Sequence, residues 1–162
     1  RYGEKIFCCG SLSHSVPIID GQYQIFGRER KAELLSYDQD RIQFEIMPAY
    51  GIENESLRVE YFCREDKLSV AYAFKGKNRQ LTFRFVSDFE PRIIGDDIFL
   101  DDIQIIANQK CNVSYRKYLW SSYEGQNTSY ALDFSLDAVD EIKVEFDFII
   151  KQIKEGDYEI IN

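Results

Sequence analysis

The sequence lacks any apolar run close to the length of a membrane-spanning helix. Such a helix needs about 20 consecutive apolar residues, and charged residues interrupt far shorter runs throughout this chain of 162 residues. A helical membrane span is therefore excluded. From the start at Arg1, we expect no signal peptide within this chain. Because the first residue is not methionine, we expect residues 1–162 to be a single domain excised from a longer protein. The compartment stays open between the cytoplasm and the cell surface.

Basic residues are scarce relative to acidic ones. The chain has 20 lysines and arginines against 28 aspartates and glutamates, which gives a formal net charge of −8 and a pI of about 4.8. A general nucleic-acid-binding protein needs a basic surface to neutralise phosphates. An anionic membrane surface attracts clusters of basic residues in the same way. We therefore expect neither nucleic acid nor a membrane as a partner.

Residues with metal-binding or nucleophilic chemistry are also few. His14 is the single histidine, and the four cysteines show no C-x-x-C spacing. These absences exclude a histidine-rich metal site and argue against a zinc knuckle. Cys63 is expected to be a buried free thiol, and a disulfide from Cys8 or Cys9 to Cys111 stays open. A lone histidine in a polar loop gives little support for catalysis, so we expect a protein that is not an enzyme.

An acidic cluster gives one alternative to the expectation of no cofactor. Asp96, Asp97, Asp101 and Asp102 supply oxygen ligands of the kind that calcium prefers, without the spacing of an EF-hand. The cluster is interpreted as a solvated acidic loop, with a structural calcium ion as the alternative.

Aromatic residues are abundant and follow a period of two. Tyrosine and phenylalanine number 11 and 12, and aromatic residues make up 15% of the chain. Apolar residues alternate with polar ones in many short segments, which is typical of half-buried strands. We expect strands at 5–9, 16–19, 23–26, 32–37, 41–46, 57–63, 68–74, 81–85, 98–100, 103–106, 111–120, 130–136, 142–150 and 158–161. Residues 87–97 are expected to form a crossover connection and residues 121–128 a polar loop. The pattern predicts an all-β, antiparallel, jelly-roll-like β-sandwich of about 10–12 strands.

The region from Leu57 to Phe85 is predicted to be a three-stranded meander. A turn at Glu65-Asp66 pairs Cys63 with Leu68, Tyr61 with Val70, Val59 with Tyr72 and Leu57 with Phe74. A second turn at Gly76-Lys77 pairs Tyr72 with Leu81, Val70 with Phe83 and Leu68 with Phe85. Both registers keep the large apolar side chains on one face, where another layer must cover them.

An aromatic group near residue 120 is the first candidate binding site. Tyr118 and Trp120 share one strand face, and Tyr115 lies on the opposite face. Large rings with polar neighbours suit a flat polar ligand such as a sugar, although packing of both rings into the core is the alternative. The candidate ligand-binding residues are Tyr115, Arg116, Tyr118, Trp120, Tyr123, Gln126 and Asn127.

The outer face of the meander is the second candidate. Small residues at Ser69, Ala71 and Ala73 lie between longer polar and aromatic side chains. Such a face forms a shallow polar groove or an ordinary solvated surface. The flanking residues are Arg58, Glu60, Phe62, Gln80, Thr82 and Arg84.

The chain resembles jelly-roll carbohydrate-binding modules in strand number, in size, in the phrase Ile98-Phe99-Leu100-Asp101-Asp102-Ile103 and in the aromatic pair Tyr118 and Trp120. The likeness extends to sugar-recognition β-sandwich domains attached to glycan-processing proteins. The resemblance implies glycan binding by stacking on aromatic rings.

Three functional hypotheses follow. The first is a non-catalytic domain that binds a glycan or another polar ligand. The second is a protein-interaction or assembly sandwich, which includes a homo-oligomer. The third is a hydrolase or isomerase that uses His14 or a pair of facing carboxylates.

Overall fold

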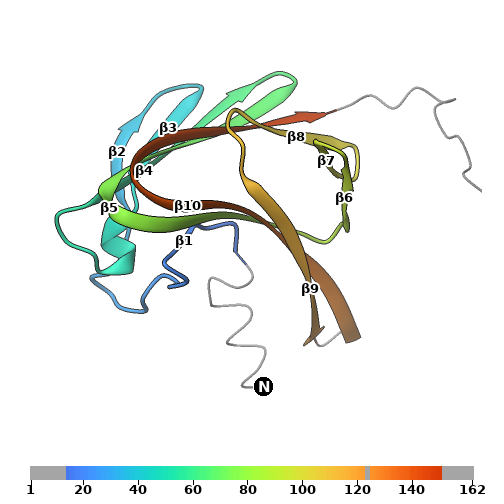
Figure 1. Ribbon diagram of the computed structural model, residues 1–162, viewed down its shortest axis with the longest axis horizontal. Coiled ribbons are helices and arrows are strands. Elements are labelled where there is room, and N and C mark those ends of the chain that lie inside the picture. Colours follow the sequence, from blue (N-terminus) through green and yellow to red (C-terminus); the bar gives the residue numbers. More distant parts are fainter. Residues whose placement is uncertain (1–13, 123–124, 151–162) are drawn as a thin grey trace, which may run out of the picture.

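The computed structural model describes residues 14–122 and 125–150 of the chain. These residues form ten strands, all paired antiparallel in one continuous sheet. The main path through the sheet follows the order β2-β3-β4-β5-β10-β8-β7-β6, with β1 added to β5 and β9 added to β10 (Figure 1). The strands are β1 (Ile18–Ile19), β2 (Glu33–Tyr37), β3 (Arg41–Glu45), β4 (Ser56–Arg64), β5 (Lys67–Ser87), β6 (Pro91–Ile94), β7 (Asp97–Leu100), β8 (Ile103–Ala107), β9 (Asn112–Ser122) and β10 (Gly125–Ile150); η2 (Met47–Tyr50) is a 3-10 helix.

Two very long strands hold the sheet together. β5 and β10 pair over most of their lengths, from Lys67 opposite Ile149 to Ser87 opposite Tyr130. Both strands curve together, so that the sheet bends over on itself (Figure 1). We call one side of the bend the β4 half, which contains residues 67–75 of β5, residues 141–150 of β10 and their neighbours β2, β3, β4, β6, β7 and β8. The β9 half contains residues 81–87 of β5, residues 125–136 of β10, β1 and β9.

The core lies on the concave side of this bend. Phe83 and Phe134 of the β9 half and Phe146 of the β4 half are fully buried. Their rings meet across the fold: the ring centroids of Phe134 and Phe146 are 4.9 Å apart, and those of Tyr72 and Phe83 are 4.6 Å apart. Aromatic pairs of this kind contribute about 0.5–1.5 kcal/mol each beyond the burial of their area. The bend is therefore stabilised by aromatic side chains from both halves.

The alternation of apolar residues changes phase inside the bend. In β5 the buried apolar residues occupy even positions up to Phe74 and odd positions from Leu81 onward. The register between β5 and β10 is irregular from Lys75 to Leu81, and Asn78 has a φ of 49°. A residue in the left-handed region inside a strand is typical of a β-bulge, which bends the strand and resets which face a side chain occupies. The bulge thus keeps both apolar stretches of β5 on the concave side.

The first hairpin of the predicted meander is confirmed, and the second is not. All four predicted pairs between β4 and β5 are present, from Cys63 opposite Leu68 to Leu57 opposite Phe74. The second turn, at Gly76-Lys77, was predicted wrongly, because β5 continues through it and β10 provides the next strand. Val70 lies opposite Phe146, and Phe83 lies opposite Phe134. A hairpin and a bulged strand place the same residues on the same face, so the apolar pattern does not distinguish them.

Several other segments also differ from the expected ones. Residues 23–26 form no strand, and the expected crossover at 87–97 contains β6. The expected loop at 121–128 is largely strand, because β9 extends to Ser122 and β10 begins at Gly125. Residues 130–136 and 142–150 belong to the single strand β10. The expected strands at 5–9 and 158–161 lie outside the described residues.

The prediction of an all-β, antiparallel fold is confirmed, and ten strands fall within the expected range. A sandwich of separate sheets is not confirmed, because the strands form one bent sheet. Within residues 14–122 and 125–150, no helix is long and apolar enough to cross a membrane.

The two cysteines in the described part of the chain are free thiols. The expected burial of Cys63 was wrong: the residue is exposed, because the end of the β4–β5 hairpin extends beyond the packed concave face. Cys111 is half-buried, and burial raises the pKa of its thiol. Cys8 and Cys9, the expected partners for a disulfide, lie outside the described residues.

Candidate functional sites

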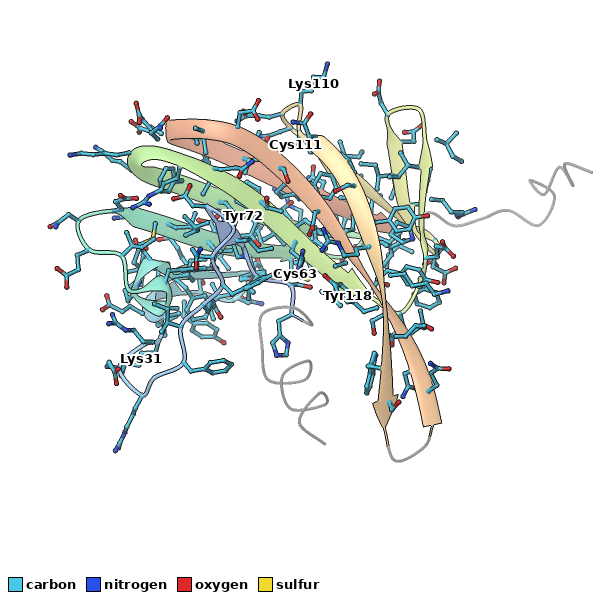
Figure 2. All side chains as sticks on the ribbon, turned by 60° about the horizontal axis from the view of Figure 1, so that its bottom comes forward. Lys31, Cys63, Tyr72, Lys110, Cys111 and Tyr118 are labelled. Atoms are coloured by element: carbon cyan, nitrogen blue, oxygen red, sulfur yellow. The ribbon has the colours of Figure 1, made fainter. Side chains whose placement is uncertain are left out.

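The aromatic face of β9 is the first candidate site. Arg116, Tyr118 and Trp120 alternate along β9 and therefore share one face. Tyr118 and Trp120 are both half-buried, so neither ring is sealed in the core. The paired ends of β9 and β10 extend away from the rest of the sheet, with Tyr118 near the point where they leave it (Figure 2). This arrangement keeps part of each ring accessible to a ligand.

A short hydrogen-bond chain fixes the orientation of the tryptophan. The Trp120 indole Nε1 donates to Ser129 Oγ at 3.1 Å, and Ser129 Oγ donates to Asp88 Oδ1 at 3.0 Å. Ser129 is buried and lies on β10 opposite Tyr118. A ring held in this way loses little conformational freedom when a ligand stacks on it.

The other predicted residues of this site are placed in different surroundings. Tyr115 occupies the opposite face of β9, where its hydroxyl donates to Glu90 Oε1 at 3.2 Å, and this hydrogen bond raises the pKa of the phenol. Gln126 is exposed opposite Ser121 near the tip of the hairpin. Asn127 lies opposite Trp120 and donates through Nδ2 to the carbonyl of Gly125. Tyr123 lies outside the described residues.

A buried ion pair supports the sheet beside this site. Arg84 of β5 donates through Nε and Nη2 to the two carboxylate oxygens of Asp133 on β10, each at 2.7 Å. Arg84 is only 3% exposed. Burial lowers the pKa of its guanidinium, but the hydrogen bonds and the charge of Asp133 outweigh burial and hold that pKa above its usual value. The sequence pattern does not indicate this pair, because its partners are 49 residues apart.

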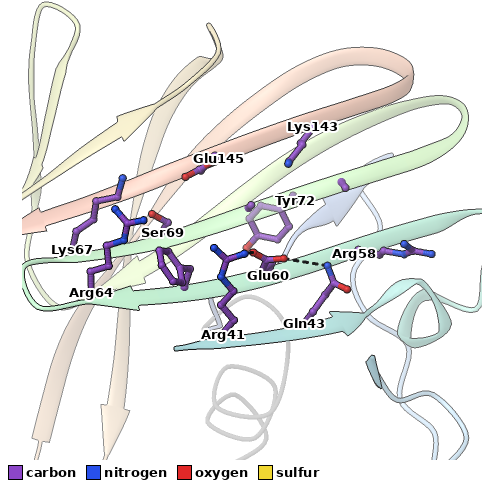
Figure 3. A pocket seen from close by; sticks show the side chains of 13 residues that line it. Arg41, Gln43, Arg58, Glu60, Arg64, Lys67, Ser69, Tyr72, Lys143 and Glu145 are labelled. Atoms are coloured by element: carbon purple, nitrogen blue, oxygen red, sulfur yellow. Dashed lines mark hydrogen bonds and ion pairs between the residues drawn. The ribbon is translucent and has the colours of Figure 1, made fainter. Parts of the chain in front are cut away.

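A groove on the outer face of the β4 half is the second candidate site. Its floor consists of the small residues Ser69, Ala71 and Ala73 of β5, and longer side chains from β3, β4 and β10 rise around them (Figure 3). The volume of the groove is about 440 Å³. The lining residues are Arg41, Gln43, Arg58, Glu60, Phe62, Arg64, Lys67, Ser69, Ala71, Tyr72, Ala73, Lys143 and Glu145.

The charge of this groove is opposite to that of the whole chain. Five of the lining residues are cations and two are carboxylates. At one end, the guanidinium carbons of Arg41 and Arg64 lie 4.4 Å and 4.7 Å from the centroid of the Phe62 ring. Cation–π contacts of this kind orient the two guanidinium groups at little cost in solvation. Arg64 also lies directly opposite Lys67 across the strand pair, which concentrates positive charge at this end.

The predicted outer groove is therefore present only in part. Arg58, Glu60 and Phe62 line it as expected, but Gln80, Thr82 and Arg84 do not. Thr82 and Arg84 lie beyond the bulge and belong to the β9 half, and Gln80 lies in the irregular stretch of β5 between the two halves. Arg41, Gln43, Lys143 and Glu145 were missed. The signal for them was available, because they are the outward-facing polar positions of the expected strands at 41–46 and 142–150.

The acidic cluster is divided between two turns. Asp96 and Asp97 lie in the turn before and at the start of β7, and Asp101 and Asp102 follow its other end. The Asp97 carboxylate accepts a hydrogen bond from Gln104 at 2.8 Å. In the part of the chain that the structure describes, no three histidine, cysteine or acidic residues are grouped to hold a metal. His14 is exposed.

Comparisons with known proteins show similarity at the level of fold. No family model matches the chain, and a search of curated protein sequences finds no match. Among solved structures, heparan sulfate lyase HepC from Pedobacter heparinus, in a mutant form, matches 88% of this chain with a TM-score of 0.64 and 13% identity. A heparinase III structure with methylated lysines matches 89% of the chain with a TM-score of 0.67 and 11% identity.

These structures are much longer than the chain. The match covers 25% of the lyase and 24% of the heparinase III structure, so the chain spans about a quarter of their length. The fold is thus shared with part of glycan-processing enzymes. The specific resemblance to jelly-roll carbohydrate-binding modules is not confirmed.

Proposed function

We propose that the chain is a non-catalytic glycan-binding domain of a larger glycan-processing protein. The observation that carries this proposal is the half-exposed Trp120, whose indole nitrogen is held by Ser129 on a face shared with Tyr118 and Arg116. Sugars present both C–H groups, which stack on rings, and hydroxyl groups, which need hydrogen-bond partners. The face of β9 offers rings beside the exposed guanidinium of Arg116, and so meets both needs.

The shared fold supports the same function. The matched structures are named as lyases of heparan sulfate and as heparinase III, and their names refer to glycans. In those longer chains, the matched part accounts for about a quarter of the length. A binding role alongside a separate catalytic part is consistent with this proportion.

The test is a substitution of the tryptophan. For Trp120→Ala, we expect glycan affinity to fall about five- to tenfold, because loss of one stacking ring costs about 1–1.5 kcal/mol. The measurement is a glycan array, followed by calorimetric titration of the glycans that bind. Leu119→Ala is the matched control, since Leu119 is 62% exposed and points to the opposite face of β9. Equal binding by wild type and Trp120→Ala would remove this site.

A protein-interaction domain is the second candidate function. The outermost strand, β2, is exposed at all five positions and carries Leu34, Leu35 and Tyr37. An edge strand with exposed apolar side chains is a template for pairing with another chain. Sedimentation at increasing concentration tests the homo-oligomeric form, and a strict monomer at all concentrations counts against it.

A further inference from the structure

We propose that the groove on the outer face of the β4 half binds a glycan chain that carries carboxylate or sulfate groups. This inference rests on the proposed glycan-binding function and adds a second site, on the half of the sheet that does not contain Trp120. The occupant is argued from charge complementarity and from the shape of the groove.

The first step is the imbalance of charge. In a chain with a net charge of −8, the groove gathers Arg41, Arg58, Arg64, Lys67 and Lys143. Among the described residues, Arg64 and Lys143 form no ion pair, so their charges are available to a ligand. They come from different strands, β4 and β10. Two available cations on separate strands suit a ligand with more than one anionic group.

The second step is the weakness of the pairs that Arg41 and Arg58 make, in contrast to Lys67, which is held by Asp147 at 2.7 Å. Arg41 lies 3.6 Å from Glu60, and Arg58 lies 3.8 Å from Glu45, with both arginine side chains more than half exposed. Exposed ion pairs at such distances contribute about 1 kcal/mol or less. A carboxylate or sulfate that offers a bidentate geometry to arginine replaces such a partner at little cost.

The third step is the shape of the site. The floor runs along β5 from the row of Lys67 to the row of Ala73, which spans about 20 Å of extended strand. The side chains on this floor are small, and Ser69 Oγ is already bound to Asp147 Oδ1 at 2.7 Å. The floor therefore offers contact without large obstructions, and the polar groups stand along its sides. An extended chain fits this geometry better than a single sugar.

The experiment titrates the 162-residue chain with oligosaccharides of equal length at low and moderate salt. The probes are a neutral maltooligosaccharide, its sulfated form and an oligogalacturonate, with polyglutamate as a peptide polyanion. We expect the acidic saccharides to bind at least tenfold more tightly than the neutral one, and this difference to shrink as salt screens the charges. Arg64→Ser with Lys143→Ser should remove the advantage of the acidic saccharides. Ala71→Phe, which fills the floor without changing charge, should also reduce it.

Matched controls separate this site from general charge and from the tryptophan site. Arg28→Ser with Lys77→Ser removes one arginine and one lysine from exposed positions outside the groove and should change affinity less than twofold. Trp120→Ala should leave the advantage of the acidic saccharides intact.

Four results would overturn the proposal. They are an equal loss in the control pair, unchanged acidic binding in Arg64→Ser with Lys143→Ser, polyglutamate binding as tight as that of the saccharides, and disappearance of the acidic advantage in Trp120→Ala. A wild-type chain that binds none of the saccharides would overturn both sites. In Trp120→Ala, loss of binding to the neutral saccharide with retained binding to the acidic ones would support both sites.

Discussion

At the scale of single residues, the pair of Arg84 and Asp133 is the most deeply buried ion pair among the described residues. Both oxygens of one carboxylate are used by one guanidinium, and the ring of Tyr23 lies 6.0 Å from the guanidinium carbon. The pair joins the two central strands on the outer face of the β9 half. It also borders the face that carries Tyr118, whose interaction with Arg84 further raises the guanidinium pKa. Loss of this ion pair should therefore affect both the stability of the fold and the first candidate site.

For Asp133→Ala, we expect the free energy of unfolding to fall by about 3–5 kcal/mol, because the arginine charge stays buried without its partner. Chemical denaturation of the variant and the wild type measures this difference. Asp137→Ala, at an exposed position only four residues further along β10, should change stability by about 0.5 kcal/mol or less. Arg84→Met combined with Asp133→Leu should recover most of the loss. A loss below about 1 kcal/mol in Asp133→Ala would contradict the role given to this pair.

At the scale of elements, Arg79 stabilises the bend of β5 through contacts with two residues outside that strand. Its Nε and Nη2 donate to the two oxygens of Glu55 at 3.0 Å and 2.8 Å, and its Nη1 donates to Asp20 Oδ2 at 2.7 Å. These contacts tie the bulge to the segment before β4 and to the turn after β1. Burial raises the pKa of Asp20, but the hydrogen bonds from Arg79 and Gln80 outweigh burial and lower it below 3.8.

For Arg79→Gln, we expect a loss of about 1 kcal/mol at neutral pH, a modest value because Arg79 and Asp20 are partly solvated. A carboxylate with a lowered pKa in the folded state stabilises the protein above its unfolded pKa, and this contribution is lost as pH falls through the folded pKa. The wild type should therefore lose stability below about pH 4 more steeply than the variant. Thermal melting at a series of acidic pH values measures both slopes. Parallel slopes would show that the Arg79–Asp20 contact does not contribute to the pH dependence of stability. The control is Arg92→Gln, which removes an arginine that donates to the Asp101 carbonyl.

The elements also show what the sequence could and could not predict. The hairpin of β4 and β5 was predicted to the residue, because a two-residue turn and two alternating strands fix one register. The pairing of β5 with β10 was not predicted, because period two identifies strands and faces but not which distant strand lies alongside. At the aromatic site, the shared face of Tyr118 and Trp120 followed from alternation alone. The anchoring of Trp120 through Ser129 and Asp88 depends on tertiary contacts over as many as 41 residues, which the sequence pattern does not contain.

At the scale of the whole molecule, the sheet uses its two surfaces differently. The concave side is a core of aromatic and aliphatic residues, while the convex side carries both candidate sites, one on each half. The concave side includes the phenols of Tyr61 and Tyr72, and burial raises the pKa of each. Tyr72 is only 2% exposed. Ionisation of such a group requires the core to open.

This burial predicts the alkaline limit of stability for the whole fold. A tyrosine with a raised pKa in the folded state contributes stability that is fully present below the unfolded pKa of about 10 and is lost as pH rises further. The free energy of unfolding should therefore fall above about pH 10, with each buried tyrosine adding about 1.4 kcal/mol per pH unit to the slope. Tyr72→Phe should make the slope shallower by that amount, as measured by denaturation at several alkaline pH values together with tyrosinate absorbance. An unchanged slope would show that Tyr72 ionises without unfolding.

The pairing of β5 with β10 also sets an order of events during synthesis on the ribosome. The partner of Lys67, Ile149, is translated 82 positions later, after every other described strand has been synthesised. Until then, the apolar face of the β4–β5 hairpin cannot pack against its partners on β10. Closing so long a loop carries an entropic cost that local contacts do not offset. That surface must therefore be shielded while the residues between the two partners are translated, and chaperones that recognise exposed aromatic segments would meet it in this window.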